Sequence, residues 1–375
     1  MKVRIDKAAL MVPLYRAQGV VNHKHTNNIL ACVHIAAGDD GLTFVATDYD
    51  IVITTQVAAD VLEPGSALIN GRALFDVVRA LPEGSSVLLS SDANQRLRIE
   101  TGRSYYHLNG FAPEEFPQLE ELQSGRSLVC DKSQLEVLLK RTLFSVSPDP
   151  QRPALNGILL EIEPDGDGRA LIRTVSTDGH RLSKAERTVA TNDYAGDKHR
   201  CIIHHRGAAE LQRILEGSDP SVRIEFVGRN VVFSSDKARL QVKQIEENFP
   251  DYARVIPERG DAAVTLVTSA LVASIRRVSS LGSPKEAILR VELDVGHMAL
   301  EMTYLDFGDA HEDLEVPEYR GSKLKVGFNP KYLLDVCGVL GAETITLEVS
   351  DQFSPCLLHS DEEPGSVFVI MPMRL

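Results

Sequence analysis

Apolar residues recur every three or four positions in several segments of the chain, which is the spacing of one face of an α-helix. Leu10, Leu14 and Ala17 show this spacing first. It predicts six helices, near 6–18, 70–81, 132–144, 205–216, 268–278 and 329–340. Runs rich in β-branched residues, or alternating in polarity, predict strands between them, among these 42–46, 51–57, 96–100 and 104–108.

The second and last predicted helices resemble each other in sequence. Residues 74–81 read LFDVVRAL and residues 333–340 read LLDVCGVL, 259 positions later. Half of that interval predicts a third copy near the middle of the chain, and 209–215 has the same apolar spacing. The chain therefore contains an internal repeat of about 130 residues.

Other motifs recur at nearly the same interval. Thr47-Asp48 returns as Thr177-Asp178, and Glu115-Phe116-Pro117 returns as Asn248-Phe249-Pro250. A repeat of this length can bury a core of its own, unlike a solenoid unit. We therefore expect three similar domains, at 1–122, 127–255 and 262–375, joined by short polar linkers.

Each repeat is expected to open with a helix and to continue with strands, a second helix and antiparallel hairpins. Asp6 and Asp131 stand where helix N-caps are expected, and Pro13 should strain the first helix. This order of elements predicts an α+β fold of two helices packed on mostly antiparallel sheet in each domain.

Composition and charge exclude several classes of protein. The formal net charge of −13 argues against a protein that coats nucleic acid or an anionic membrane over its whole surface. The charged start of the chain and the absence of an 18-residue apolar run argue against secretion and membrane spanning. Five scattered cysteines, with no C-x-x-C pair, suggest neither a disulfide framework nor a zinc site. A cytoplasmic location fits these features.

The charge is unevenly distributed along the sequence. The six predicted helices sum to +6, which leaves −19 for the rest of the chain. Helices that all faced one way would form a basic face that attracts a phosphate backbone without reading its sequence. The alternative is that these are ordinary solvated positions on helices.

Four short motifs, in order, carry a resemblance to a known family. They are Leu155-Asn156-Gly157, then TDGHRL at 177–182, NFPDY at 248–252 and MPMRL at 371–375. Together with the triple repeat, they make the chain resemble the β sliding clamps, the processivity subunits of bacterial replicative DNA polymerases. The resemblance covers essentially the whole chain. It implies a head-to-tail homodimer, closed into a six-domain ring around duplex DNA, with no catalytic site and no cofactor.

The resemblance also implies a pocket between the second and third domains for peptides of the polymerase α subunit, the clamp loader and other partners. The residues carried over to it are Arg152, Leu155, Thr177, Gly179, His180, Arg181, Leu182, Pro250, Val255, Asn329, Tyr332, Val369, Met371, Pro372, Met373 and Arg374. Leucine, valine, proline and methionine suit an adaptable apolar site, and arginine and histidine can bind peptide carbonyl or carboxylate groups. Without the resemblance, Met371 and Met373 would be interpreted as the end of a core strand.

For DNA the resemblance suggests Lys24 and Arg72, and for the dimer interface Arg103, Ser104 and Tyr106 against Leu281. Pro153 and Ala154 occupy places where other members present aromatic residues, so a stacking contact with single-stranded DNA is not carried over.

Two other functions compete with this interpretation. An enzyme lacks support, because no Walker A, G-x-G-x-x-G or G-x-S-x-G motif occurs and His180 has no Ser or Cys partner in sequence. The calcium-loop-like run from Asp165 has Ser176 at its twelfth position, where a glutamate is required, and predicts a hairpin turn instead. His23, His25, His204 and His205 lack neighbouring metal ligands. A monomeric module that binds peptides without encircling DNA stays open.

Overall fold

The computed structural model describes most of the chain in two compact units. The described residues are 1–21, 27–120, 122, 125–166, 168–191, 197–217, 219–235, 237–258, 262–282, 288–316 and 319–375. The first unit consists mainly of Met1–Ser133 and Arg206–Gln244, and the second mainly of Gln134–Val189 and Ile245–Leu375. The division between the units runs through the middle repeat.

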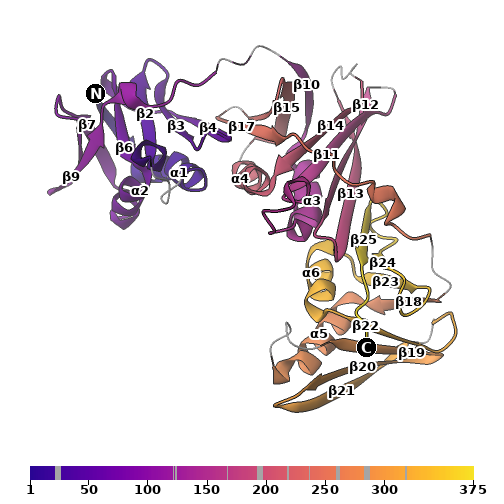
Figure 1. Cartoon of the computed structure of the whole chain (residues 1–375). Helices are drawn as coiled ribbons and strands as arrows, with labels where there is room; N and C mark the ends of the chain where they lie inside the picture. The colour runs from indigo at the N-terminus through magenta and orange to yellow at the C-terminus, as the bar shows by residue number, and fades with distance from the viewer. Residues whose placement is uncertain are drawn as a thin grey trace. The chain divides into compact units, whose positions relative to one another are not determined.

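The first repeat folds as two helices on antiparallel strands. Its elements are β1 (Lys2–Asp6), α1 (Lys7–Gln18), β2 (Cys32–Gly38), β3 (Gly41–Thr47), β4 (Ile51–Val57), β5 (Asp60–Glu63), β6 (Gly65–Asn70), α2 (Gly71–Ala80), β7 (Ser86–Ser91), β8 (Arg96–Thr101) and β9 (Ser104–Phe111). One ladder runs β6–β2–β3–β4 and another β5–β1–β7–β8–β9. Helices α1 and α2 pack against each other (Figure 1).

The middle repeat contributes to both units. Its elements are β10 (Arg126–Asp131), α3 (Lys132–Thr142), β11 (Gly157–Pro164), β12 (Arg169–Thr177), β13 (Arg181–Ala190), β14 (His199–His204), α4 (His205–Leu215), β15 (Ser221–Val227), β16 (Asn230–Ser234) and β17 (Ala238–Ile245). In the first unit the ladder is β10–β15–β16–β17, and in the second β14–β11–β12.

The third repeat lies wholly in the second unit. Its elements are β18 (Ala262–Val267), α5 (Thr268–Val278), β19 (Leu289–Asp294), β20 (Gly296–Tyr304), β21 (Gly308–Val316), β22 (Leu324–Phe328), α6 (Pro330–Leu340), β23 (Thr344–Val349), β24 (Cys356–His359) and β25 (Ser366–Ile370). The strands form a four-stranded sheet, β21–β20–β19–β22, and a ladder β18–β23–β24–β25. Side chains of both helices and of these strands share one core.

The predicted helices are confirmed, with boundaries that differ by at most two residues. The described ranges contain six α-helices, and the apolar stripes Leu10–Leu14–Ala17, Leu135–Leu138–Leu139 and Leu271–Ile275–Val278 are all buried. The predicted strand 51–57 coincides with β4. The named strand ladders among the described residues are antiparallel, so the α+β class is confirmed. No helix in the described ranges is long and apolar enough to cross a membrane.

The prediction that each repeat opens with a helix is wrong. A strand comes first in all three repeats, namely β1, β10 and β18. In β1 the inward residues Val3 and Ile5 are buried, and charged residues alternate with them. Such five- or six-residue runs bury one face only, so their pattern is easily missed beside the longer helical stripe that follows.

Local signals at the helix ends and turns agree in part with the structure. Asp131 accepts the backbone N–H of Ser133 at 2.7 Å, as an N-cap should. Asp6 occupies the N-cap position of α1 without a capping hydrogen bond, and α1 continues through Pro13. At the run from Asp165, β11 and β12 form the predicted hairpin: Pro164 pairs with Ala170, and the Asp165 N–H donates to the Arg169 carbonyl at 3.0 Å. Asp167 lies outside the described residues.

Two further ladders join the repeats. In the first unit, β4 pairs with β17 of the middle repeat, from Ile51↔Val242 to Thr55↔Ala238. In the second unit, β13 of the middle repeat pairs with β25 of the third, from Arg181↔Ile370 to Ala185↔Ser366. We call these ladders the first seam and the second seam. Each repeat is thus joined to the next by continuous backbone hydrogen bonding.

Candidate functional site

The turn between β12 and β13, at the start of the second seam, is fixed by its own polar side chains. Thr177 Oγ1 accepts the N–H of Gly179 at 3.1 Å and donates to the carbonyl of Arg181 at 2.7 Å. Asp178 Oδ1 accepts the N–H groups of His180 and Arg181 at 2.9 and 3.0 Å. Gly179 has φ of 89°, a left-handed conformation that favours glycine. The turn therefore presents an exposed His180 on a rigid backbone.

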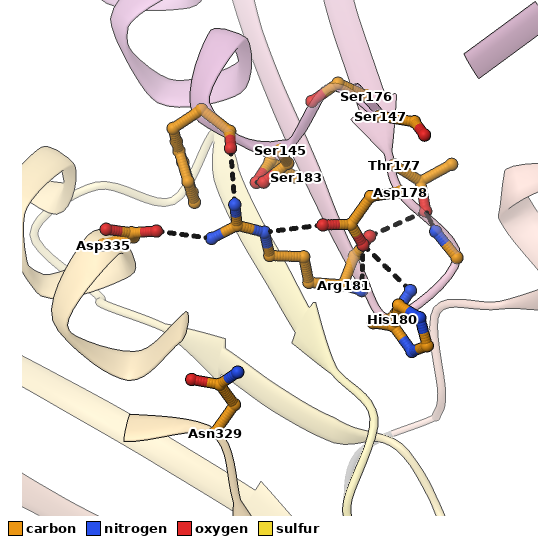
Figure 2. A network of polar contacts seen from close by, with 12 residues as sticks. Ser145, Ser147, Ser176, Thr177, Asp178, His180, Arg181, Ser183, Asn329 and Asp335 are labelled. Carbon is orange, nitrogen blue, oxygen red and sulfur yellow. Dashed lines mark hydrogen bonds and ion pairs between the residues drawn. The ribbon is translucent and has the colours of Figure 1, made fainter. Parts of the chain in front are cut away.

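Arg181 is the centre of this arrangement (Figure 2). Its side chain is 9% exposed, and it donates from Nε to Asp178 Oδ2 at 3.0 Å, from Nη1 to Asp335 Oδ2 of α6 at 2.6 Å and from Nη2 to the Phe144 carbonyl at 2.7 Å. Charge-assisted bonds of this kind are strong when little water reaches them. The guanidinium thus ties the turn to α6 and to the short 3-10 turn Leu143–Ser145 that follows α3, with each of its three nitrogens donating within the fold.

Two aromatic rings flank the Arg181 guanidinium. The centroids of the Phe144 and Tyr332 rings lie 5.1 and 4.5 Å from its central carbon, within the range of cation–π attraction. Burial, and secondarily the charge of Asp178, raises the pKa of Tyr332 above its usual value, so this hydroxyl is neutral at physiological pH. Tyr332 therefore belongs to the packing around Arg181.

The C-terminal strand and its extension run along this turn. Beyond the second seam, the Met371 N–H donates to the His180 carbonyl at 2.8 Å. Two residues later, the Met373 N–H donates to the Gly327 carbonyl at 2.8 Å. Met371 and Pro372 are half-buried, and Met373 and Arg374 are exposed. Backbone pairing thus holds the terminal segment in an extended form.

An apolar cluster underlies the second seam. Leu182 and Val369 are buried in it together with Leu159, Val175, Ile202, Phe249 and Leu357, and the half-buried Leu155, Ile245, Tyr252, Ile256 and Val367 pack against it. Val255 and Pro250 are exposed beside it in sequence. The cluster combines side chains from three of the four sequence motifs, LNG, TDGHRL and NFPDY, with strand residues just before the fourth.

The NFPDY segment is anchored by a polar network that sequence reasoning missed. The Tyr252 hydroxyl donates to Glu161 Oε2 at 2.7 Å, and Arg173 donates to Glu161 at 3.0 Å and to Glu186 at 2.9 Å. Burial, and then the hydrogen bond to Glu161, raises the pKa of Tyr252 to about 12. The alternation of charged and apolar residues in β11 and β12 gave no sign of which charges would meet.

The remaining predicted pocket residues lie around this centre. Arg152 is exposed, and a methyl group added to Gly179 would lie 3.1 Å from its Nη1. Asn329 caps α6, because its side chain accepts the Lys331 N–H at 3.0 Å. Asp335 and Phe144, which contact Arg181, were not predicted. Asp335 lies in the repeated LLDV sequence, but nothing in that sequence indicates its partner 154 residues away.

Nucleophilic and metal chemistry find no support in the described side chains. All five cysteines are buried and free, and burial raises the pKa of Cys32 and Cys337 to about 11 and of Cys130 and Cys201 to about 12. Thiols with such values are protonated at neutral pH and react slowly. Within the ranges that the structure describes, no three His, Cys, Asp or Glu residues are grouped to hold a metal ion.

Comparison with known proteins assigns the whole chain to one family. The N-terminal, central and C-terminal domains of the DNA polymerase III beta subunit match residues 1–120, 130–251 and 253–374. The beta sliding clamp of Caulobacter vibrioides is 32% identical, with 100% of each chain covered. The chain belongs to the DNA polymerase III beta subunit family.

Solved structures of other beta sliding clamps agree with this assignment. The Caulobacter crescentus clamp, solved with PEG bound to a putative beta-motif tethering region, has a TM-score of 0.92 at 32% identity, covering 100% of this chain and 99% of its own. The Pseudomonas aeruginosa clamp bound to griselimycin has a TM-score of 0.90 at 31% identity, with 100% of both chains covered. As a beta sliding clamp, the protein is a non-catalytic processivity factor for DNA replication.

The positions suggested for DNA and for the dimer interface of this sliding clamp are only partly described. Lys24 lies outside the described residues. Arg72 is exposed near the start of α2 and lies 3.6 Å from Asp76. Arg103, Ser104 and Tyr106 are exposed at or beside the start of β9. Leu281, which follows α5, is also exposed.

Several helix cations in this clamp do not reach the surface. Lys7 is buried and donates to the Leu81 carbonyl and to Glu83. Arg16 is buried against the Ile214 carbonyl, and Arg141 is buried against Glu363 and Ser366. The sequence sum of +6 therefore overstates the charge that the helices present to solvent. Exposed helix cations include Arg72, Arg79, Lys140, Arg276 and Arg277.

Proposed function

We propose that two copies of this chain close head to tail into a ring of six similar domains that encircles duplex DNA and slides along it. The domain boundaries that we propose are 1–122, 127–255 and 262–375. Encirclement retains the clamp without tight binding, and weak, salt-screened contacts from exposed cations permit sliding. Among these cations we place Arg72, Lys140 and Arg276 toward the DNA, and we add Lys24 on the family resemblance alone.

The observation that carries this proposal is a pair of sheet edges, one of them acidic and the other aromatic with an arginine beside it. β21 pairs with β20 on one side, and the described ladders place no strand on its other side. It is acidic, with Asp309, Glu312, Asp313 and Glu315. β9 pairs with β8 through Ser104–Asn109 and presents the exposed rings of Tyr105 and Tyr106 beside Arg103.

An unpaired edge is a template for another strand, and opposite charges favour one pairing over self-association. We propose that β9 of one protomer pairs with β21 of its partner, with Leu281 of that partner beside the contact. Because the first repeat supplies one edge and the third the other, the contact repeats head to tail and two copies can close.

We also propose that the apolar cluster at the second seam is the binding surface for extended peptides of the replicative polymerase α subunit, the clamp loader and other partners. Leu155, Leu182 and Val369 would contact apolar anchors of such a peptide. Met371, Pro372 and Met373 would form its adaptable side, with Thr177, Gly179, Pro250, Val255, Asn329 and Tyr332 around it. Arg152, His180 and Arg374 are exposed and would bind its polar groups, whereas Arg181 would hold the turn in place.

The decisive experiment for encirclement uses topology. The clamp is loaded by its clamp loader onto nicked circular DNA, isolated at moderate salt, and the circle is then cut once. We expect release only after cutting, because a linear end lets a ring slide off. Equal retention on linear DNA with free ends and with blocked ends would mean binding by affinity, and failure to load would favour a monomeric peptide-binding module. We also expect a cytoplasmic clamp that gathers at replication sites on the nucleoid, visible as foci of a fluorescent fusion.

The interface has its own test. Arg103→Glu should shift the solution mass from dimer toward monomer, because it places a negative charge opposite acidic β21. Arg126→Glu, at the exposed first residue of β10, is the charge-matched control and should leave the mass unchanged. A dimer that tolerates Arg103→Glu at nanomolar concentration would contradict the proposed pairing.

Peptide binding is tested separately. Deletion of 371–375 should abolish binding of the polymerase's clamp-binding peptide while the dimer mass is retained. Met371→Ala, which preserves the backbone bond to His180, should weaken binding about tenfold through lost apolar contact. Retained affinity in both variants would exclude this surface.

A further inference from the structure

The first seam reproduces the backbone of the second in detail. In the first seam Ile51 pairs with Val242, and in the second seam Arg181 pairs with Ile370. Ile51 and Arg181 follow the repeated Thr-Asp motif at the same distance in sequence. In the first seam the Lys243 N–H donates to the Asp50 carbonyl at 2.8 Å, as Met371 does to His180 at 2.8 Å.

The two turns also share their internal hydrogen bonds. Thr47 Oγ1 accepts the Tyr49 N–H at 3.0 Å, and Asp48 Oδ1 accepts the N–H groups of Asp50 and Ile51 at 3.1 and 2.8 Å. Tyr49 thus stands at the position of Gly179 and Lys243 at the position of Met371. The seam that joins the first two repeats is a copy of the proposed peptide-binding seam with different side chains.

The first seam contains a cavity of about 330 Å³. Tyr49 and Val52 line it from the turn and β4, and Pro117 and Leu119 line it from the segment equivalent to NFPDY. This volume lies at the lower end of the range for sites that bind small ligands or a few side chains of a peptide. The cavity is therefore large enough for one or two anchors of an extended chain.

The lining of this cavity differs from that of the second seam in charge. Lys243 and Arg229 approach it from β17 and from the turn before β16, and Gln241 stands where Val369 stands in the second seam. The Lys243 ammonium lies 3.7 Å from Asp50, and both side chains are more than half exposed, so this pair is weak. Glu120 adds one carboxylate to the lining, so the two cations outnumber the single anion. A site with this excess of positive charge beside an apolar wall favours a ligand that carries carboxylate and apolar groups together.

Tyr49 is the unusual residue in this cavity. It is a non-glycine residue at φ of 75°, and 59% of its surface is exposed. A strained backbone in a residue that stays more than half exposed adds little to the packing of the core, and such strain occurs mainly at binding sites. The ring supplies a rigid aromatic wall next to Val52.

We propose that the first seam is a second peptide-binding groove, selective for an extended acidic segment of a partner protein. In this groove an apolar side chain packs against Tyr49, Val52 and Leu119, and a neighbouring carboxylate binds Lys243 and Arg229. A partner with one neutral and one acidic motif could then occupy both seams of a protomer. The inference stands apart from DNA encirclement, because it concerns peptide binding alone.

The probe is a fluorescein-labelled peptide, Gly-Asp-Leu-Glu-Phe-Gly amide, and its matched control has Asn and Gln for the two acids. Binding to the full-length clamp is followed by fluorescence anisotropy. We expect saturable binding of the acidic peptide to be about fivefold tighter than that of the neutral one and to weaken with salt, as expected for a partly exposed ion pair.

Two variants give the first seam the residues of the second. Lys243→Met should weaken the acidic peptide about fivefold and leave the neutral peptide unchanged. Tyr49→Gly should weaken both peptides through the lost aromatic wall. Lys325→Met, which removes an equal charge from β22, is the control and should change neither affinity. Because the Lys243 and Lys325 side chains are exposed, loss of folding would not explain a difference.

The position of the peptide is mapped with a benzoylphenylalanine in place of its Phe. Crosslinks to 49–52 and 117–120, retained in Met371→Ala, support the groove. Crosslinks confined to the second seam, a preference of Lys243→Met for the acidic peptide as large as that of the unmodified clamp, or no binding up to about 1 mM would overturn the proposal. Competition by an eight-residue oligothymidylate that is stronger than by unlabelled acidic peptide would assign the site to nucleic acid and would also overturn it.

Discussion

The two seams have the same backbone and opposite ionic polarity. In the first, the turn carboxylate Asp48 is bound by Arg206 of α4 at 2.6 Å. In the second, the strand residue Arg181 reaches the carboxylate Asp335 of α6, also at 2.6 Å. The strand register and the turn are the same in both. The repeat has thus kept the hydrogen-bonded frame that joins the domains and has changed the side chains that close it and face solvent.

This difference shows which features a seam requires. Backbone pairing and a capped turn are needed in both places, because an open strand end would leave buried polar groups without partners. The ionic link between turn and helix can run in either direction, since only its charge balance matters. The side chains that line the surface of each seam are the least constrained by the fold. We therefore expect the two seams to bind different partners through these side chains.

The largest effect is expected at Arg181. Arg181→Met should lower the free energy of unfolding by about 3–5 kcal/mol, because Asp178 would keep its charge without its cation and Asp335 would keep only the exposed Lys331. Urea unfolding measures this loss. Arg152→Met, at an exposed position beside the same turn, should change stability by less than about 0.5 kcal/mol. A loss of under about 1 kcal/mol for Arg181→Met would show that the network does not hold the second seam.

A smaller effect is expected from the reversed ion pair of the first seam. Asp48→Asn keeps an acceptor for the turn and Arg206→Met removes the helix cation, and each should cost about 1–3 kcal/mol, since the Asp48 side chain is only 5% exposed. The double variant should lose less than the sum of the two. Additive losses in the urea experiment would mean that Asp48 acts through the turn alone.

The seams should also respond differently to pH. The hydrogen bond and charge of Arg141, with the charge of Arg187, lower the pKa of Glu363 beside the second seam. Burial raises the pKa of Glu210, whose α4 also carries Arg206. The lowered pKa of Glu363 stabilises the fold above about pH 4.3, and this stabilisation is lost on further acidification. The raised pKa of Glu210 has the opposite effect, because it lowers the stability of the fold as pH rises above about 4.3.

Urea midpoints between pH 7 and pH 3 test this contrast. Glu363→Gln should remove the loss of stability on acidification below about pH 4.3, and Glu210→Gln should remove the loss of stability as pH rises above about 4.3. Two variants with the same profile would contradict the assignment of opposite shifts.

The smallest effects are expected at the paired turn positions. Gly179→Ala should destabilise by about 1 kcal/mol, because a residue with a Cβ is strained at this φ. Tyr49→Gly relieves the same strain but adds freedom to the unfolded chain, so stability should change by less than about 0.5 kcal/mol. Thermal unfolding compares the two. A clear loss in Tyr49→Gly would mean that the ring stabilises the fold, which would weaken the argument that it serves binding.

Helices and repeats could be predicted from the sequence because their signals are local. Leu10, Leu14 and Ala17 lie on one helix face wherever that helix packs, and strand 51–57 is marked by its own β-branched residues. The repeated Thr-Asp and Phe-Pro motifs showed that the chain is built three times over. The four motifs then identified the family, which the comparisons confirmed.

The sequence predicted which residues belong to the site, but not which side chains contact one another within it. Thr177, Leu182 and Val369 do lie in or beside one cluster, but the role of Arg181 was not foreseen. Asp178 is near it in sequence, but its other partners come from α6 and from the short 3-10 turn after α3, and nothing near Arg181 in sequence selects them. Glu161, which holds Tyr252 through a hydrogen bond, was missed for the same reason.

The sequence by itself determined the helices, the triple repeat, the class of fold and the family. The tertiary structure alone decided which strands join the repeats and which charges are buried. Arg141 was counted as a surface cation until its partner Glu363, 222 residues later, was found beside it. Hydrophobic periodicity records which face of an element is buried, but the partner of a buried charge depends on contacts between segments that are distant in the chain.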